Sequence, residues 1–235
     1  MAEPPARSIW PEMLLAVAEP SLKDTLLTWT AAQELKAGDG VLARLVEWLD
    51  AYPVNPHAEL GRAGVVCPYT RQARKIGSIR MAVLGAQAGH EQAAFIALRD
   101  GFRELGRIPV DSGSEEFRTV ILAFPECDNE AGIAMLKRVI KRLKYYALFR
   151  CFTVGFMHRE SEEKGLWNPA FRPLRSPMPV LALRYVVAQD APFIARYHLM
   201  WGPYLARYGI DGARRLFSER VRRSARTASA GTASD

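Results

Sequence analysis

Hydrophobic positions beyond residue 78 follow two different periods in turn, which predicts alternating strands and helices. Apolar residues are continuous or alternate in four short segments typical of buried strands, namely 79–84, 118–124, 151–157 and 180–187. Elsewhere they recur every three or four positions, as on a helix face that packs on a sheet, over 91–105, 129–146, 190–208 and from 211 onward. This order predicts a layered α/β fold with a mixed sheet of about four strands.

The first third of the chain has a different pattern. Two amphipathic segments, 22–35 and 41–52, are separated by Gly38-Asp39-Gly40 and predict an N-terminal helical hairpin packed on the sheet domain. Residues 1–20 resemble an irregular arm, and the basic segment 218–235 resembles a disordered tail. We therefore expect one α/β domain over 21–217, a size that fits a single hydrophobic core.

The net charge of +7 is concentrated in two places, which limits what it implies. Six arginines lie near the C-terminus, at 214, 215, 220, 222, 223 and 226, and a second cluster in one predicted helix contains Lys137, Arg138, Lys141, Arg142 and Lys144. A basic tail rich in small polar residues is typical of a solvated terminus, and no nucleic-acid motif accompanies it. We expect no nucleic-acid partner.

Cysteine usage and hydropathy predict a reduced, cytoplasmic protein. The chain has three cysteines, an odd number, and no two of them have CxxC spacing. No apolar run is long enough to span a membrane, and the N-terminus lacks the basic and apolar regions of a signal peptide. We therefore expect no membrane partner.

The segment 53–70 is the strongest candidate for a functional site. Its prolines and glycines forbid a continuous helix, and a loop of this length in a compact domain is functional or a linker. The apolar run Val65-Val66-Cys67 argues against a loose linker. The same segment carries His57, Arg62 and Tyr69, so side chains suited to ligation, anion binding and stacking lie close together in sequence.

Cys67 is followed by Pro68, which lacks a backbone N–H and fixes the direction of the chain. Cys-Pro pairs occur at thiolate ligands to haem iron. Cys67 could equally be a small buried side chain at a loop-to-helix junction, or a nucleophile paired with His57 or His158. Arg62 could hold a carboxylate or phosphate, or be a solvated or capping residue.

Three further residues outside this loop are candidates. Arg184 interrupts an apolar strand, so it needs a partner: Asp190, a backbone carbonyl or an anionic ligand. His158 ends a strand where active-site loops often begin. His198 lies in an aromatic stretch that suits a flat ligand or a core, and Gly202-Pro203 should kink the helix there.

The familiar catalytic signatures are absent. Gly85-Ala-Gln-Ala-Gly89 lacks both the Lys-Ser/Thr of a P-loop and the third glycine of a dinucleotide fingerprint, and neither GxSxG nor HExxH occurs. No pair of cysteines or histidines has the short spacing of a structural zinc site.

The segment from His57 to Tyr69, with Leu60, Gly61, Arg62, Gly64, Val66, Cys67 and Pro68, resembles the HPxLGRxGxVCP(F/Y) signature of a bacterial domain family of uncharacterised function. More distantly, the layout is similar to the YcgG-like family, some of whose members are haem-dependent oxygenating enzymes of specialised metabolism. That family also has an early proline-flanked cysteine, a strand running into Phe-Pro, and a late arginine-bearing segment.

The distant resemblance implies a haem-dependent oxygenase acting on a small amino-acid-like or nitrogenous metabolite. Cys67, or else His57 or His158, would ligate iron, and Arg62 would hold cofactor carboxylates. Arg184, Tyr69 and His198 would face the substrate. Two alternatives stay open: a non-catalytic module that binds a small anionic metabolite, and an interaction protein that uses the basic helix and tail. The oligomeric state is also open, with a homodimer as one alternative.

Overall fold

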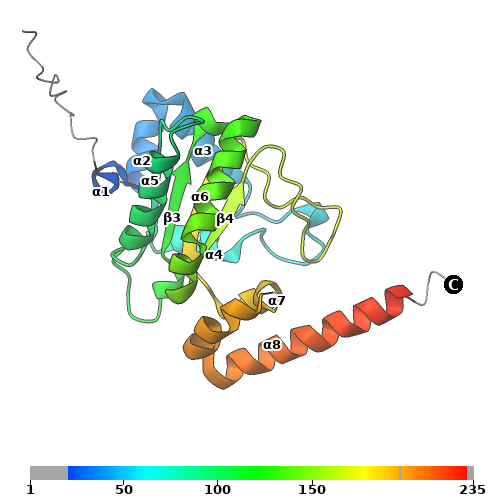
Figure 1. Cartoon of the computed structure of the whole chain (residues 1–235). Helices are drawn as coiled ribbons and strands as arrows, with labels where there is room; N and C mark the ends of the chain where they lie inside the picture. Colours follow the sequence, from blue (N-terminus) through cyan, green and yellow to red (C-terminus); the bar gives the residue numbers. More distant parts are fainter. Residues whose placement is uncertain (1–20, 196, 232–235) are drawn as a thin grey trace, which may run out of the picture.

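The computed structural model describes residues 21–195 and 197–231, with side chains as far as Val221. It confirms a mixed α/β fold (Figure 1). The helices are α1 (Leu22–Thr25), α2 (Trp29–Leu35), α3 (Gly40–Ala51), α4 (Pro68–Lys75), α5 (Glu91–Leu105), α6 (Glu130–Phe149), α7 (Ala191–Ile194) and α8 (Trp201–Gly231). The strands are β1 (Leu27–Thr28), β2 (Ile79–Val83), β3 (Thr119–Ala123), β4 (Phe152–Met157) and β5 (Val180–Tyr185).

The sheet is mixed, as predicted, and its strand order is β1-β2-β3-β5-β4. β2 and β3 are parallel, and every other neighbouring pair is antiparallel. The last strand is not at an edge: β5 lies between β3 and β4, with Arg184 opposite both Thr119 and Thr153. β4 is therefore an edge strand.

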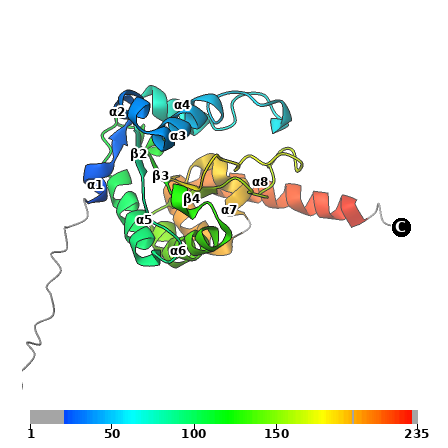
Figure 2. The same cartoon turned by 90° about the horizontal axis from the view of Figure 1, so that it is seen from above.

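One face of the sheet is covered by α5 and α6, which lie side by side over it (Figure 2). Alternate residues of β3 and β5 point to these helices, and they are fully buried against the helices' apolar stripes. The strand residues are Val120, Leu122, Leu181 and Leu183, and the helix residues include Leu98, Phe102, Leu136 and Val139. We call this side the closed face.

The other face is covered by helices at one end only. α2, α3 and α4 pack over β2 and β3 and bury Leu45, Leu49 and Ala73 against Met81 and Ile121. Over β5 and β4, two loops take the place of helices: 53–67, which precedes α4, and 158–179, which precedes β5. We call this side the open face.

Two sequence predictions need correction in the first third of the chain: the continuous helix over 22–35 and the loop that extends to residue 70. The helix predicted over 22–35 is interrupted by β1, which adds a short fifth strand antiparallel to β2. Thr28 then starts α2 as its N-cap, because its hydroxyl accepts a hydrogen bond from the Ala31 N–H at 3.1 Å. The helix α4 follows the candidate loop and begins with Pro68 in its first turn.

The C-terminal region also differs from prediction. Gly202-Pro203 does not kink a helix, because both residues lie in the first turn of α8, where proline needs no hydrogen-bond donor. The break comes at Gly209, whose φ of 52° and ψ of −135° are not helical; this agrees with the two helices predicted over 190–208 and from 211 onward. Beyond it α8 projects from the body and includes 218–231 of the predicted tail (Figure 1). Residues 1–20 lie outside the described part.

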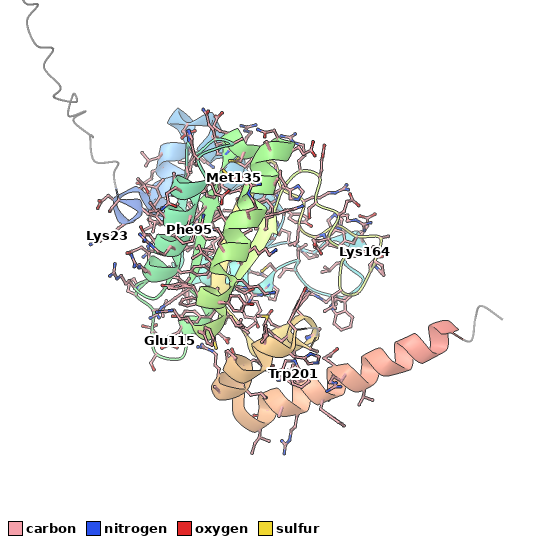
Figure 3. All side chains as sticks on the ribbon, in the orientation of Figure 1. Lys23, Phe95, Glu115, Met135, Lys164 and Trp201 are labelled. Atoms are coloured by element: carbon pink, nitrogen blue, oxygen red, sulfur yellow. The ribbon has the colours of Figure 1, made fainter. Side chains whose placement is uncertain are left out.

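Figure 3 shows how the side chains fill these layers. Phe95 and Met135 lie on α5 and α6, Lys164 belongs to the long loop before β5, and Trp201 starts α8. Within 21–195 and 197–231, no helix combines the length and apolar character needed to cross a membrane.

Candidate functional site

A cavity of about 520 Å³ lies between the open face of the sheet and the two loops that cover it. Its floor is formed by the residues of β3, β4 and β5 that point to this face, namely Thr119, Ile121, Thr153, Gly155, Met157, Ala182 and Arg184. Most of these side chains are small or polar, so the sheet leaves space below the loops. We call this space the central cavity.

Aromatic and aliphatic side chains form the walls and mouth of the central cavity. Trp48 lies in α3, Tyr52 is the C-cap of that helix, and Phe171 lies in the loop before β5. Trp167, Phe193 and Tyr197 also line the cavity and are about half exposed. A cavity with mainly apolar walls and a few polar groups is typical of small-molecule sites, which range from about 300 to 1,000 Å³.

The two covering loops are joined by direct contacts. The Tyr52 hydroxyl donates a hydrogen bond to the Pro173 carbonyl at 3.1 Å, and the Asn168 side-chain amide donates to the Glu59 carbonyl at 2.8 Å. The ring of His57 stacks on Phe171 with 4.6 Å between centroids. These contacts hold the loops together as a roof.

Arg62 braces the first loop from within. Its guanidinium donates hydrogen bonds to the carbonyls of Ala63, Val65 and Val66 at 2.9, 2.9 and 3.3 Å. Backbone carbonyls in an irregular loop have no ladder partner, so an arginine fork that reaches three of them fixes the loop's shape. The side chain also lines the cavity, but its donors are already directed at its own loop.

Arg184 and Asp190 form a paired charge at the floor of the cavity. The guanidinium donates to both carboxylate oxygens at 2.7 and 2.8 Å, and to the Tyr185 carbonyl at 2.8 Å. Asp190 also accepts from the Val187 N–H at 2.9 Å. Burial alone would lower the pKa of Arg184, but the hydrogen bonds and charge of Asp190 outweigh it and the pKa is raised.

Tyr69 and Cys67 lie beside this pair. The Arg184 guanidinium lies over the Tyr69 ring at 5.5 Å from its centroid, and the Tyr69 hydroxyl donates to Gln189 Oε1 at 2.6 Å. Burial, then the negative charge of Glu116, raises the pKa of Tyr69 to about 12. Cys67 lies close enough to Arg184 that a negative charge on its sulfur would raise the pKa of the arginine further.

Cys67 is positioned by the start of α4. It is the N-cap residue of that helix, its N–H donates to the Pro53 carbonyl at 2.7 Å, and Pro68 directs the chain into the first turn. The half-buried side chain lines the cavity, and its sulfur makes no hydrogen bond within the described residues. We call Cys67, Tyr69, Arg184 and Asp190 the polar corner.

Three predicted histidines do not line the central cavity. His57 lies behind the wall, between Tyr52 and Phe171. His158 follows β4, where burial and then the charge of Lys137 lower its pKa. His198 contacts the Trp201 ring edge-on. The structure therefore brings together Cys67, Tyr69, Arg62 and Arg184 from the predicted set.

Several lining residues were not singled out from the sequence. The aromatic wall residues carry no local motif, and neither does Gln189, which does not line the cavity but accepts the hydrogen bond of Tyr69. Gly155 was a weak signal, because glycine inside a strand often marks a close approach or a space that a ligand fills. An added Cβ there would meet only ordinary contacts, the nearest being Ala182 Cβ at 3.8 Å.

Among the described residues, no group of three histidine, cysteine, aspartate or glutamate side chains is arranged to hold a metal ion. A family model described as a domain of unknown function, DUF6875, matches residues 42–219. That range contains most of α3, the roof loops and the whole polar corner, and it agrees with the uncharacterised family expected from the sequence. No curated protein and no solved structure matches the chain.

Proposed function

The chain belongs to the DUF6875 family of domains of unknown function, and we propose that its central cavity binds a small, flat and mainly apolar molecule. One observation carries the proposal: a cavity of about 520 Å³ lies on the open face, its walls are mainly apolar, and its polar groups include those of the polar corner. Protein interiors are normally close-packed, so a space of this size beneath a braced roof is expected to have an occupant.

The polar corner limits the chemistry of that occupant. Asp190 neutralises the charge of Arg184. Arg62 keeps its charge, but its N–H donors are directed at the carbonyls of its own loop, so we expect neither arginine to be the main partner of the ligand. Thr153 offers a hydroxyl group and Cys67 a thiol. The hydroxyls of Thr119 and Tyr69 already donate to Phe117 and Gln189, so they can only accept hydrogen bonds from a ligand. The ligand's polar edge would therefore be recognised by hydrogen bonds, and Cys67 would be the group able to form a bond to it or to a metal.

Filling the cavity from its floor tests this proposal. The uncharged fluorescent probe N-phenyl-1-naphthylamine should bind the wild-type protein and Gly155→Ala equally. Gly155→Phe should weaken binding by roughly tenfold or more, because the phenyl group enters the cavity and such a loss corresponds to about 1.4 kcal/mol. Native mass spectrometry of the purified wild-type protein and Gly155→Phe would show whether a molecule that co-purifies with the former is lost from the latter. Equal probe binding by Gly155→Phe, in a variant that unfolds at the wild-type temperature, would overturn the proposal.

A haem-dependent oxygenating enzyme is the second candidate, and Cys67 is the specific observation that favours it. Of the three iron ligands expected from the sequence, only Cys67 lines the cavity, and its sulfur makes no hydrogen bond within the described residues. The aromatic walls also fit a flat macrocycle. The arginines fit less well, because both are already bound to protein groups. When bound, haem with a thiolate ligand would supply oxygen-activating chemistry.

The visible absorption spectrum tests the haem candidate. Protein expressed with a haem precursor should show an intense haem band that shifts or vanishes in Cys67→Ala. Cys151→Ala is the matched control, because Cys151 lies outside the cavity and its thiol donates to the Pro203 carbonyl. Protein that neither carries haem nor takes it up when added would exclude this candidate and leave the small-molecule site intact.

A further inference from the structure

The basic cluster on α6 is divided by the structure into two groups with different surroundings. Arg138 and Arg142 point toward α5, where they donate to the two carboxylate oxygens of Glu91 at 2.9 and 3.2 Å. Arg142 also lies over the Phe95 ring, 4.5 Å from its centroid. These two arginines are therefore used to join the helices of the closed face.

The three lysines of the cluster face a different way. Lys137, Lys141 and Lys144 are spaced by four and three residues, so they share one side of the helix. The Lys144 ammonium lies 5.1 Å from the centroid of the Tyr197 ring. Within the described residues, Lys137 and Lys141 make no ion pair. All three line a groove of about 510 Å³, which we call the lysine groove.

The floor of the lysine groove is apolar. It runs along the edge strand β4 and is formed by side chains such as Phe152, Val154, Ile140 and Met200. Phe152 and Val154 point to the closed face, so the groove lies mainly on the opposite side of the sheet from the central cavity. The two meet around the strand edge, where Thr153, Val154, Tyr197 and Met200 line both.

We propose that the lysine groove binds a long-chain anion of the fatty-carboxylate class. The alkyl chain lies along the apolar floor, and the carboxylate is held by Lys137 and Lys141. The groove presents three cations beside apolar side chains, which complements a molecule with one charged end and one apolar end. A short anion would leave the floor exposed, and an uncharged chain would leave the lysines unpaired. The proposal goes beyond the central cavity and does not depend on what occupies it.

Calorimetric titration with decanoate tests this proposal on the full chain. Decanol supplies the chain without the charge, and acetate supplies the charge without the chain. Decanoate should bind more tightly than either. Lys137→Gln with Lys141→Gln should weaken decanoate binding on the order of tenfold, as expected for the loss of two partly exposed ion pairs. The matched control, Arg138→Gln with Arg142→Gln, removes two charges from the same helix and should leave the affinity unchanged.

Several results would overturn the proposal. The first is that decanol binds as tightly as decanoate. The second is that the lysine and arginine variants have the same affinity for decanoate. The third is that the protein does not bind decanoate but sediments with anionic vesicles, and that this sedimentation requires the lysines. The last result would assign the lysines to a membrane surface instead. Decanoate binding should persist in Gly155→Phe, since Gly155 does not line the groove. The two binding proposals, for the groove and for the central cavity, can therefore be rejected independently of each other.

Discussion

The two faces of the sheet are covered in different ways, and the difference locates the candidate site. On the closed face, α5 and α6 lay apolar rows over β3 and β5, and the strand side chains between them are fully buried. On the open face, helices cover only β2 and part of β3, and two loops rich in proline and glycine cover the rest. The cavity lies where the helices end.

The edge strand β4 carries this difference in its own sequence. Its residues Phe152, Val154 and Phe156 point to the closed face, whereas Thr153 and Gly155 point to the cavity. Large apolar side chains fill the space below a helix, and small ones leave space below a loop. The roof, in turn, depends on polar and ring contacts such as the hydrogen bond from Tyr52 to Pro173. The comparison indicates that the closed face supplies most of the packed core, and that the open face supplies the central cavity.

The largest effect is expected at the charged pair of the open face. Asp190→Ala should destabilise the protein by about 3 kcal/mol, the lower end of the range for a broken buried pair, because the Arg184 side chain is 25% exposed. The variant leaves this guanidinium without its carboxylate and also removes the acceptor of the Val187 N–H. Thermal unfolding should show a fall in Tm on the order of 10 °C for a chain of this size.

A second variant separates the charge from the packing at this position. Replacing both partners, as Arg184→Met with Asp190→Leu, should recover part of the loss, since no charge is then left unpaired. A loss below about 1 kcal/mol for Asp190→Ala, the range of an exposed ion pair, would show that the pair is solvated and would remove it from the site's framework.

The fold was predictable where burial produces a strong pattern. The four predicted strands and the helix α5 agree with the structure to within two residues at each end, because their side chains are buried in continuous or periodic runs. β1 has only two residues and therefore no periodicity to detect. In α4 the only buried residue is Ala73, so the helix presents no apolar stripe. Its first three residues were predicted as the end of the loop 53–70, and the rest was not assigned.

The site was predictable only for residues that break a local rule. Arg184 in an apolar strand and Cys67 before a proline both stand out in the sequence, and both line the cavity. His57 was equally conspicuous, but its stacking on Phe171 depends on a loop more than 100 residues away in the chain. Such contacts depend on strand order and register, which hydrophobic periodicity does not specify.

An intermediate effect on stability is expected from two separate glycine-to-alanine variants, one on each side of the sheet. In Gly132→Ala, on α6, the new Cβ would lie 2.5 Å from the backbone carbonyl oxygen of Cys127. The backbone must move, so we expect a loss of about 1–3 kcal/mol, even though alanine favours a helix. Gly155→Ala, on β4, meets only ordinary contacts and should change stability by less than about 0.5 kcal/mol.

Denaturant unfolding of the two alanine variants measures this difference. Equal losses would contradict the distinction between a filled and an unfilled face. A loss in Gly155→Ala larger than in Gly132→Ala would reverse it, and would also disqualify Gly155→Ala as the control for cavity filling.

The smallest effect is expected at alkaline pH, and part of it should come from two tyrosines that line the central cavity, Tyr52 and Tyr69. Burial, then the charge of Glu59, raises the pKa of Tyr52 to about 12, as burial does first for Tyr69. Between pH 10 and pH 12 these phenols lose their protons in the unfolded chain before the folded one. The unfolded state then binds fewer protons, so the free energy of unfolding should fall as the pH rises through this window.

The two hydroxyls concerned are also the donors to Pro173 and Gln189, and a phenolate cannot donate. Replacing both tyrosines, as Tyr52→Phe with Tyr69→Phe, should therefore cost stability at pH 8 but flatten its decline above pH 10. The exposed Tyr145, on the closed-face helix α6, is the control: Tyr145→Phe should leave the decline unchanged. If the double variant declined as steeply as the wild-type protein, the tyrosines that titrate with unfolding would lie elsewhere, as at Tyr204, where burial also raises the pKa to about 12.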